Sequence, residues 1–147
     1  MKKYFLFLAF ALATGISCAF AGVKPEVSPR VQHSFEKEFP KASVIAWGED
    51  EGYIKATFVM NYSRMEAWFN EEGKLLGAVR NLSFSQLPLN VVKGINNRYP
   101  SANIIEILEI TNEEGTTYRV TANEMNKTMI LVSTPEGHVV KTGRVRK

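Results

Sequence analysis

Residues 27–44 read VSPRVQHSFEKEFPKASV, and residues 87–104, sixty positions later, read LPLNVVKGINNRYPSANI. The two stretches carry matching residues at the same spacing. The first has Val27, Val31, Phe35, Phe39-Pro40, Ala42 and Val44, and the second has Leu87, Val91, Ile95, Tyr99-Pro100, Ala102 and Ile104. A recurrence of this length indicates a duplicated fold.

Each stretch predicts an amphipathic helix. Val31, Phe35 and Phe39 recur every four residues, which places them on one helix face. Ser28-Pro29 is typical of a helix start, with Ser as the cap and Pro in the first turn. Pro40 cannot continue the helix. In the second copy the helix is expected over 87–99, although Gly94 lowers its intrinsic propensity.

After each helix the apolar period changes from near four to two, which predicts strands. In the segment Tyr53–Met60, the even-numbered residues Ile54 to Met60 share one face and the odd-numbered residues share the other. Turns separate the segments; those at 48–52, 71–73, 112–115 and 135–137 contain glycine, and those at 61–63 and 124–127 do not. We expect strands at 42–47, 53–60, 65–70 and 74–80, and again at 102–111, 116–123, 128–133 and 138–145.

The predicted fold class is α+β, built from two tandem α-β4 repeats at 22–84 and 85–147 that form one compact unit. Strands joined by short turns are antiparallel, so we expect an antiparallel sheet with both helices packed on one face. The opposite face is then left open. Tyr53 aligns with Tyr118 at an offset of 65, and Gly73 aligns with Gly137 at an offset of 64.

The N-terminus has the three parts of a secretory signal. Lys2 and Lys3 precede an uncharged run from Tyr4 to Ile16, and Ala19-Phe20-Ala21 matches a signal peptidase site. We expect residues 1–21 to be removed and the chain to be periplasmic or secreted. The run is shorter than the roughly 20 apolar residues that span a bilayer, so no stable membrane insertion is expected after cleavage. Lipidation at Cys18 is the alternative.

Composition excludes several classes of function. Cleavage after Ala21 removes two of the 18 basic residues and none of the 15 acidic ones, so the exported chain is close to neutral. A nearly neutral chain gives no case for nucleic acid as a partner. Cleavage also removes the single cysteine, which excludes disulfides, thiolate metal sites and a cysteine nucleophile from the exported chain.

No catalytic, cofactor-binding or metal-binding set is predicted. His33 and His138 are the histidines, and each is expected to be solvated, since nucleophilic catalysis needs a base beside a nucleophile. No phosphate-binding or dinucleotide-binding motif occurs. The acidic turn Glu49-Asp50-Glu51 offers oxygen ligands that calcium accepts, but it lacks the spacing of a known calcium loop, and we interpret it as a solvated turn.

Aromatic residues give the sharper signal. The candidate binding-surface residues are Trp47, Tyr53, Tyr62 and Trp68. Trp68 alternates with Phe69 along a predicted strand, so one of the two faces away from the helix. The second copy has Ile107 and Val132 at the places of the two tryptophans, which favours the first repeat as the binding half. In the alternative interpretation, the aromatics fill the space between the repeats.

Basic residues gather at the C-terminus: Lys141, Arg144, Arg146 and Lys147. Charged residues on an edge strand commonly prevent edge-to-edge aggregation, and this is the default interpretation. Docking to an acidic partner or a membrane surface is the alternative.

The sequence resembles the PepSY-like proteins of the bacterial cell envelope, whose fold is related to the β-lactamase inhibitor proteins (BLIP). The resemblance covers about 27–145 and rests on the helix ends at Phe39-Pro40 and Tyr99-Pro100, on the glycines at 73 and 137, and on the segment 67–74, AWFNEEGK. It implies a periplasmic, non-catalytic domain that binds proteins or inhibits peptidases. It supplies no catalytic residues, and kinship of fold does not transmit a target.

The leading functional hypothesis is a non-catalytic binding module whose partner is another envelope protein or a peptide. It would act through the open face and the turns at 48–52, 61–64 and 71–73. The alternative is a small-ligand binding protein, for a peptide, lipid or glycan, with a pocket between sheet and helix beside Trp47, Tyr53 or Trp68. The sequence does not predict the oligomeric state.

Overall fold

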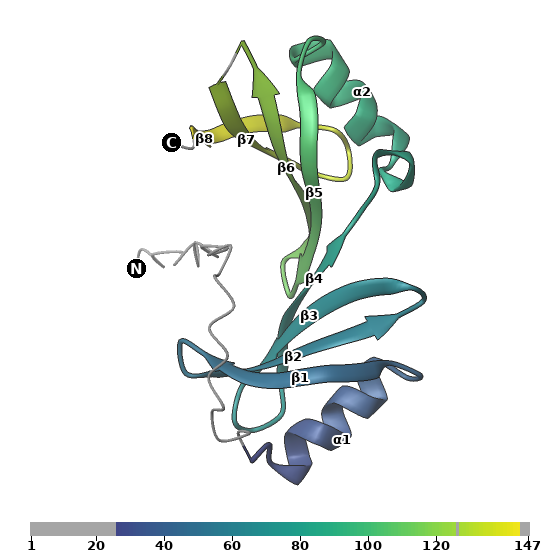
Figure 1. The fold of residues 1–147 in the computed structure, drawn as a ribbon, viewed down its shortest axis with the longest axis vertical. Helices are drawn as coiled ribbons and strands as arrows, with labels where there is room; N and C mark the ends of the chain where they lie inside the picture. The colour runs from purple at the N-terminus through teal and green to yellow at the C-terminus, as the bar shows by residue number, and fades with distance from the viewer. Residues whose placement is uncertain (1–25, 126, 145–147) are drawn as a thin grey trace.

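The computed structural model describes residues 26–125 and 127–144 (Figure 1). The expected signal peptide lies outside the described residues. The elements are α1 (Pro29–Glu38), β1 (Ser43–Asp50), β2 (Tyr53–Met60), β3 (Ser63–Phe69), β4 (Leu75–Asn81), the 3-10 turn η1 (Phe84–Gln86), α2 (Leu89–Arg98), β5 (Asn103–Asn112), β6 (Gly115–Glu124), β7 (Lys127–Ser133) and β8 (Val139–Arg144). The first half comprises α1 and β1–β4, and the second half comprises the elements from η1 to β8.

All eight strands belong to one antiparallel sheet, in which each strand pairs with its neighbours in the sequence. The two halves join where β4 pairs with β5, from Gly77 opposite Asn112 to Asn81 opposite Leu108. The expected antiparallel sheet with two helices is therefore observed. Its continuity depends on this five-pair ladder, which links segments separated by the whole of η1 and α2.

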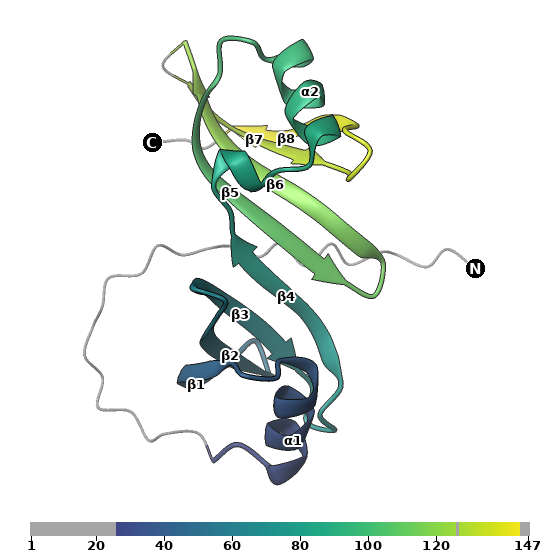
Figure 2. The ribbon, with the colours of Figure 1, turned by 90° about the vertical axis from the view of Figure 1, so that its right-hand side faces the viewer.

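Both helices pack on the same face of the sheet (Figure 2). Residues directly opposite one another in a ladder share a face. Met65 is opposite Arg80, Arg80 is opposite Glu109, and Glu109 is opposite Tyr118. Met65 packs against the core under α1 and Tyr118 belongs to the core under α2. We call the other side of the sheet, which carries Tyr53, Lys55, Thr57 and Val59 of β2, the open face.

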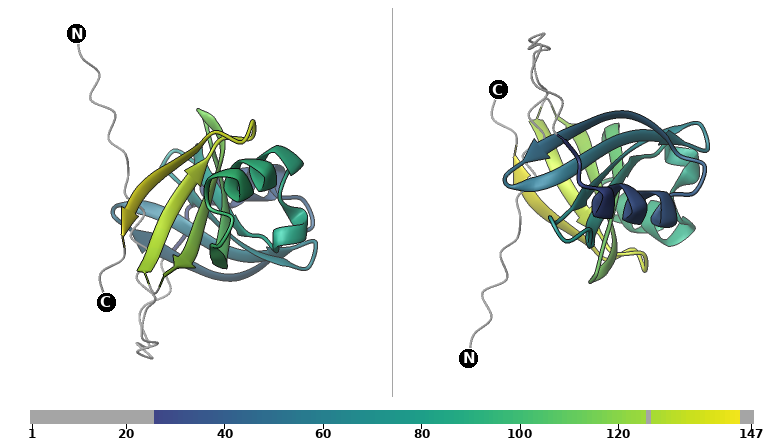
Figure 3. Two further views of the ribbon diagram at one scale, coloured as in Figure 1. Left: turned by 90° about the horizontal axis from the view of Figure 1, so that it is seen from above. Right: turned by 90° about the horizontal axis from the view of Figure 1, so that it is seen from below.

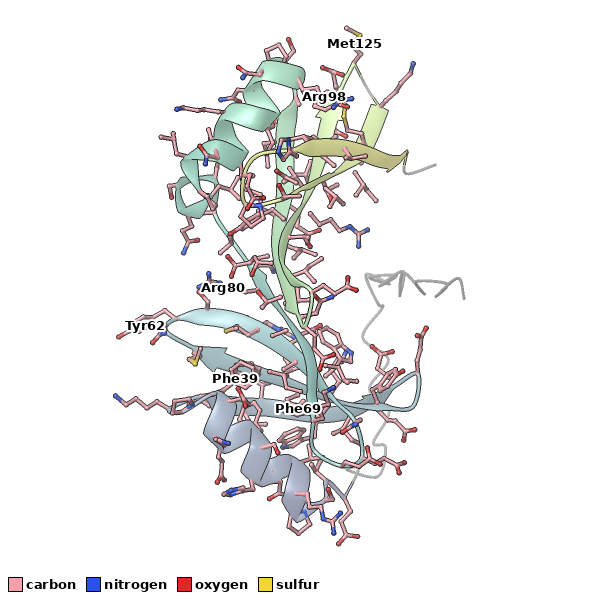
Figure 4. All side chains as sticks on the ribbon, turned by 180° about the vertical axis from the view of Figure 1, so that it is seen from behind. Phe39, Tyr62, Phe69, Arg80, Arg98 and Met125 are labelled. Atoms are coloured by element: carbon pink, nitrogen blue, oxygen red, sulfur yellow. The ribbon has the colours of Figure 1, made fainter. Side chains whose placement is uncertain are left out.

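Each half has its own hydrophobic core. The Ser28 hydroxyl caps α1 by accepting the Val31 backbone N–H at 3.4 Å, and Pro29 is the first helical residue. The ring of Phe35 lies edge-on to that of Phe58, with ring centres 5.0 Å apart. Figure 4 shows Phe39 and Phe69 between α1 and the sheet. Since α1 and α2 cover different strands (Figure 3), the two cores are separate clusters.

The second core is mainly aliphatic, with Tyr118 as its buried aromatic residue. Val91 and Ile95 of α2 are buried against Val120 and Leu131. The helix begins at Leu89 rather than at the expected Leu87, because the chain first forms η1 and reaches α2 through Pro88. Arg98 fixes the far end of α2 to β8, its Nη1 atom donating to the Val139 carbonyl at 2.8 Å.

Glycines allow the last hairpin of each half to touch its helix. Gly73 has φ +86°, and a Cβ there would lie 2.9 Å from the Ser34 hydroxyl and 3.0 Å from the Arg30 carbonyl oxygen. Gly137 has φ +89°, and a Cβ there would overlap the Asn90 carbonyl. Gly94 of α2 in turn packs against the Gly137 carbonyl, which accounts for a glycine within a helix.

The first hairpin is tighter than expected. β1 continues to Asp50, and the turn shrinks from 48–52 to Glu51-Gly52. These two residues have φ of +51° and +85°. Positive φ at both central positions is the two-residue hairpin geometry that matches the twist of the flanking strands. Cross-strand pairing of Asp50 with Tyr53 therefore overrides the low strand propensity of Glu49 and Asp50.

The expected alignment of Tyr53 with Tyr118 is wrong by one residue. Trp47 is opposite Ala56, and the equivalent Ile107 is opposite Val120, so the offset of the second strand is 64 and Ile54 matches Tyr118. A one-residue change of register reverses which face a side chain occupies. Tyr53 lies on the open face, whereas Tyr118 lies on the helix face. The β5–β6 hairpin is thus four residues longer than the β1–β2 hairpin.

The sheet bends at β4, so the open faces of the two halves turn toward each other (Figure 1). The extra length of β5 contributes to the join. Thr111 and Asn112, which the shorter β1 lacks, pair with Ala78 and Gly77 of β4. The insertion thus provides two of the residues that connect the halves.

Replacing Gly137 with alanine should destabilise the protein more than replacing Gly52 does. Both glycines have positive φ, but nothing lies within 4 Å of a Cβ at Gly52. Gly52→Ala should cost about 1 kcal/mol through backbone strain alone. Gly137→Ala should cost roughly 1–3 kcal/mol more because of the overlap with Asn90. Chemical denaturation compares the two, and equal losses of stability would contradict the predicted contact.

Candidate functional site: the open face of the sheet

A polar and aromatic cluster lies on the open face of the first half. The Trp68 indole Nε1 donates a hydrogen bond to Asp50 Oδ2 at 3.1 Å. The Lys55 ammonium lies 5.9 Å from the centre of the Trp68 ring, within range of a cation–π attraction. The Trp68 side chain thus contacts one negatively charged group and one positively charged group.

Strand register brings these side chains together. Lys55 is opposite Trp68, and Asp50 closes the β1–β2 hairpin opposite Tyr53. On the other side of Trp68, β4 presents Gly77, which has no side chain. The indole therefore lies between a lysine and a glycine across the sheet, and its N–H reaches the end of β1.

The four residues expected at the binding surface do not form one patch. Tyr53 and Trp68 lie on the open face. Trp47 lies on the helix face, where its ring meets Phe35 edge-on at 5.2 Å between centres. Tyr62 is fully exposed at the tip of the β2–β3 turn (Figure 4). Trp47, Phe58 and Phe69 lie under α1, rather than in a space between the two halves.

Several side chains on the open face are buried although no helix of the described chain covers them. Trp68 is 5 % exposed, Thr57 is 7 % exposed and Leu108 is 4 % exposed. Such values belong to a concave surface, and they agree with the bend of the sheet at β4. Their burial limits direct access, so the half-buried Tyr53 and Lys55 are the more accessible part of the site.

Sequence reasoning missed the polar partners of Trp68. The alternation along β2 already placed Lys55 on the same face as Tyr53, so the sequence did contain a signal that Lys55 lies on the open face. Asp50 was assigned to an acidic turn, because its strand pairing depends on a hairpin geometry that composition does not reveal. The hydrogen bond from Trp68 joins residues that are 18 positions apart.

A second polar cluster lies on the helix face between the two cores. The Arg80 guanidinium donates to Glu109 Oε1 from Nε at 3.1 Å and from Nη2 at 2.7 Å. Burial raises the pKa of Tyr118 above 10.0, and the charge and hydrogen bonding of Glu109 raise it further, while Arg80 opposes the shift. This cluster joins β4, β5 and β6. A separate ion pair links Lys74, just before β4, to Glu113 in the β5–β6 turn.

The expected small-ligand pocket beside α1 is not supported by the packing. Phe35, Phe39 and Phe58 fill the space between helix and sheet. A shallow cavity of about 470 Å³ lies instead in the second half, beside the point where the chain leaves β4. Its lining is Asn81, Leu82, Ile105, Glu106, Ile107 and Thr121.

The histidines lie apart from these clusters. His33 is exposed on α1, and His138 is exposed after the β7–β8 turn. Within residues 26–125 and 127–144, no three side chains gather in a way that could hold a metal ion.

Neither helix of the described chain has the length and apolar character needed to cross a membrane. Comparison with family models and with curated proteins gives no match.

Solved structures do match. A DUF2874 family protein from Bacteroides ovatus is 26% identical, with a TM-score of 0.73 over 84% of this chain and 89% of that chain. A BLIP-like protein from Bacteroides fragilis is 23% identical, with a TM-score of 0.73 over 80% of this chain and 86% of that one. A Bacteroides eggerthii protein, provisionally described as periplasmic, is 21% identical, with a TM-score of 0.72 over 84% and 90%. The chain therefore has a BLIP-like fold.

Stability should fall in alkaline solution as Tyr118 ionises. A pKa that is higher in the folded protein gives stability that is complete below the unfolded value of 10.0 and is lost as pH rises through the folded value. Tyr118→Phe should flatten this alkaline slope, while Tyr62→Phe, at an exposed turn, should leave it unchanged. Chemical denaturation at a series of pH values on both sides of 10.0 measures how the free energy of unfolding changes with pH. An identical slope in Tyr118→Phe and wild type would contradict the raised pKa of Tyr118 as the cause of the alkaline loss of stability.

Proposed function

We propose that this protein is a non-catalytic, periplasmic binding module that recognises another polypeptide of the cell envelope through the open face of its first half. The observation that carries the proposal is the cluster of Asp50, Lys55 and Trp68 on a concave sheet face that no described helix covers. The chain is a tandem duplication of an α-β4 unit, related to the PepSY-like proteins.

The proposed location has two supports. The first 21 residues carry the charged, apolar and small-residue segments of a secretory signal, so we propose that they are removed on export. One of the similar solved structures is itself provisionally described as periplasmic. Lipidation at Cys18 is the competing outcome, and the mass of the exported chain distinguishes the two.

The chemistry of the open face favours a polypeptide as the partner. Lys55 and Thr57 of β2 lie opposite Trp68 and Glu66 of β3, so cationic, anionic, hydroxyl and aromatic groups alternate over a small area. Interfaces between proteins combine aromatic anchors with polar rims. The exposed Tyr62 extends from the β2–β3 turn and provides a further aromatic contact beside this surface.

The two halves differ in the side chains that they carry at this place on the open face. At the positions equivalent to Lys55 and Trp68, the second half has Arg119 opposite Val132. A charged group is kept in each half, but the aromatic anchor is present only in the first. This difference supports the first half as the binding half.

A photoreactive amino acid at position 55 or 62 should crosslink to a discrete envelope protein. The same amino acid at the exposed helix positions 37 or 93, on the opposite face, is the matched control and should give no such product. Gel analysis of crosslinked envelope extracts, with mass spectrometry of each band, measures this. Equal products from both faces, or products from the helix positions alone, would contradict recognition by the open face.

A further inference from the structure

β5 is longer than the strand that pairs with its outer edge. β4 pairs only with residues 108–112, whereas β6 pairs with β5 from Asn103 to Asn112 (Figure 1). The part of β5 before Leu108 therefore has no strand on this side among the residues that the structure describes. The cavity of about 470 Å³ lies at this place, beside the point where the chain leaves β4.

The backbone of Ile107 offers this cavity a hydrogen-bond donor. The Ile107 carbonyl accepts the Leu82 N–H at 3.0 Å, and in such a pair the N–H and carbonyl of one residue point to the same side. The reciprocal bond, from the Ile107 N–H to the Leu82 carbonyl, is not formed. Within residues 26–125 and 127–144 no acceptor is found for this N–H, although Ile107 is only 3 % exposed. Buried backbone donors are nearly always hydrogen-bonded, so an acceptor inside the cavity is expected.

Three polar side chains line the same cavity from the open face. Glu106 is opposite Thr121, and Asn81 is opposite Leu108, the next open-face residue of β5. They provide a carboxylate, a hydroxyl and an amide oxygen. Glu106 is exposed, and no ion pair is found for it among the described residues. The cavity thus offers a ligand several oxygen acceptors and one negative charge.

The rest of the lining is apolar. Leu82 and Ile107 are buried, and Ile105, the unpaired residue of the β5 bulge, is 53 % exposed. Bulges re-aim a side chain and are common beside functional sites. An isoleucine that is more than half exposed at the cavity provides a contact for an aliphatic side chain.

The first half keeps the bulge but lacks this charge. At an offset of 60, Ala46 stands at the place of Glu106, and each of the two is opposite a threonine, Thr57 in the first half. The fold therefore does not require a carboxylate at this position. The negative charge is a feature of the second half alone.

We propose that this cavity binds the free N-terminal residue of another polypeptide. The α-ammonium group donates to the side-chain oxygens of Glu106, Thr121 and Asn81, and the carbonyl of the same residue accepts the Ile107 N–H. Its side chain lies against Ile105. The site is on the second half, so it goes beyond the proposed function and does not depend on the binding cluster of the first half.

The cavity distinguishes an N-terminal residue from other ligands. Glu106 and Ile107 are consecutive residues, so the acceptor and the donor lie close together, as do the ammonium and carbonyl of one N-terminal residue. The ammonium of a lysine lies at the end of a four-carbon chain, far from its own carbonyl. A C-terminal carboxylate could accept the Ile107 N–H, but it would meet the like charge of Glu106, which is unfavourable.

NMR spectra of the backbone and side-chain amides, recorded on the chain purified after export and titrated with leucinamide, test the proposal. At about pH 6 the α-amino group of this probe is protonated. Shifts should concentrate at the Ile107 N–H and the Asn81 side-chain amide. Binding should be in the millimolar range, because so small a ligand makes few contacts. Signals of Ala46 and Thr57, at the equivalent place in the first half, should stay unchanged.

Matched probes and variants separate the contributions to binding. N-acetyl-leucinamide lacks the ammonium, leucine adds a carboxylate, and N-acetyl-lysinamide carries its ammonium at the end of the side chain. Each should bind at least about tenfold more weakly than leucinamide, because a charged hydrogen bond is lost or a like charge is introduced. Glu106→Gln should weaken leucinamide binding about tenfold for the same reason. Glu114→Gln, an exposed change in the β5–β6 turn, is the matched control and should have no effect.

Four outcomes would overturn the proposal. Absence of localised shifts throughout the millimolar range would exclude the site. Equal binding of N-acetyl-leucinamide would exclude recognition of the ammonium, and equal binding of N-acetyl-lysinamide would exclude the N-terminal residue as the ligand. Unchanged leucinamide binding in Glu106→Gln would exclude the carboxylate from the site. Unchanged amide signals away from the cavity establish that each variant is folded.

Discussion

The antiparallel ladder between β4 and β5 is the interaction on which the rest of the structure depends. Each half contains one helix and four strands around a core of its own, and only the pairing of Gly77–Asn81 with Leu108–Asn112 makes them one sheet. Because opposite residues in a ladder share a face, this register also places α1 and α2 on the same side. A shift of one residue would move one helix to the opposite face.

The same ladder shapes the candidate site. The sheet bends at β4, and the bend turns the open faces of the two halves toward each other, where Trp68 and Leu108 are buried although no helix among the described residues covers them. Asp50 accepts a hydrogen bond from the Trp68 indole N–H, and the Lys55 ammonium lies over the same ring. Separate cores allow the two halves to differ in composition without loss of the fold. The first half carries an aromatic core and the proposed binding cluster, while the second has a mainly aliphatic core.

Much of this fold could be predicted from the sequence, because local patterns determine it. The spacing of Val31 and Phe35 placed α1, and the alternation of Tyr53–Met60 assigned each residue of β2 to its face. An antiparallel sheet with both helices on one face was expected, but the strands and the register that join the halves could not be predicted in the same way, since β4 and β5 meet across a long connection. Boundaries also shifted where pairing overrode propensity, as at Asp50, and where an unexpected turn, η1, delayed the start of α2.

The site was predicted less completely than the fold. Alternation showed that one of Trp68 and Phe69 faces away from the helix, and the structure places Trp68 there. It gave no signal that Asp50 accepts the indole N–H, because that contact depends on a tight hairpin turn. Trp47 belongs to the core, since its position opposite Ala56 places it beneath α1. Composition alone cannot distinguish a tryptophan on one face of a strand from a tryptophan on the other.

The central claim is that one ladder joins the two halves in a single register. Leu82 N–H donates to the Ile107 carbonyl, so the opposite pairs Asn81–Leu108 and Val79–Ile110 are of the non-hydrogen-bonded kind, in which the Cα atoms approach closely. Nuclear Overhauser spectroscopy should therefore show strong Hα–Hα contacts within both pairs. Intact contacts inside each half without these two, or contacts displaced by one residue, would contradict the account.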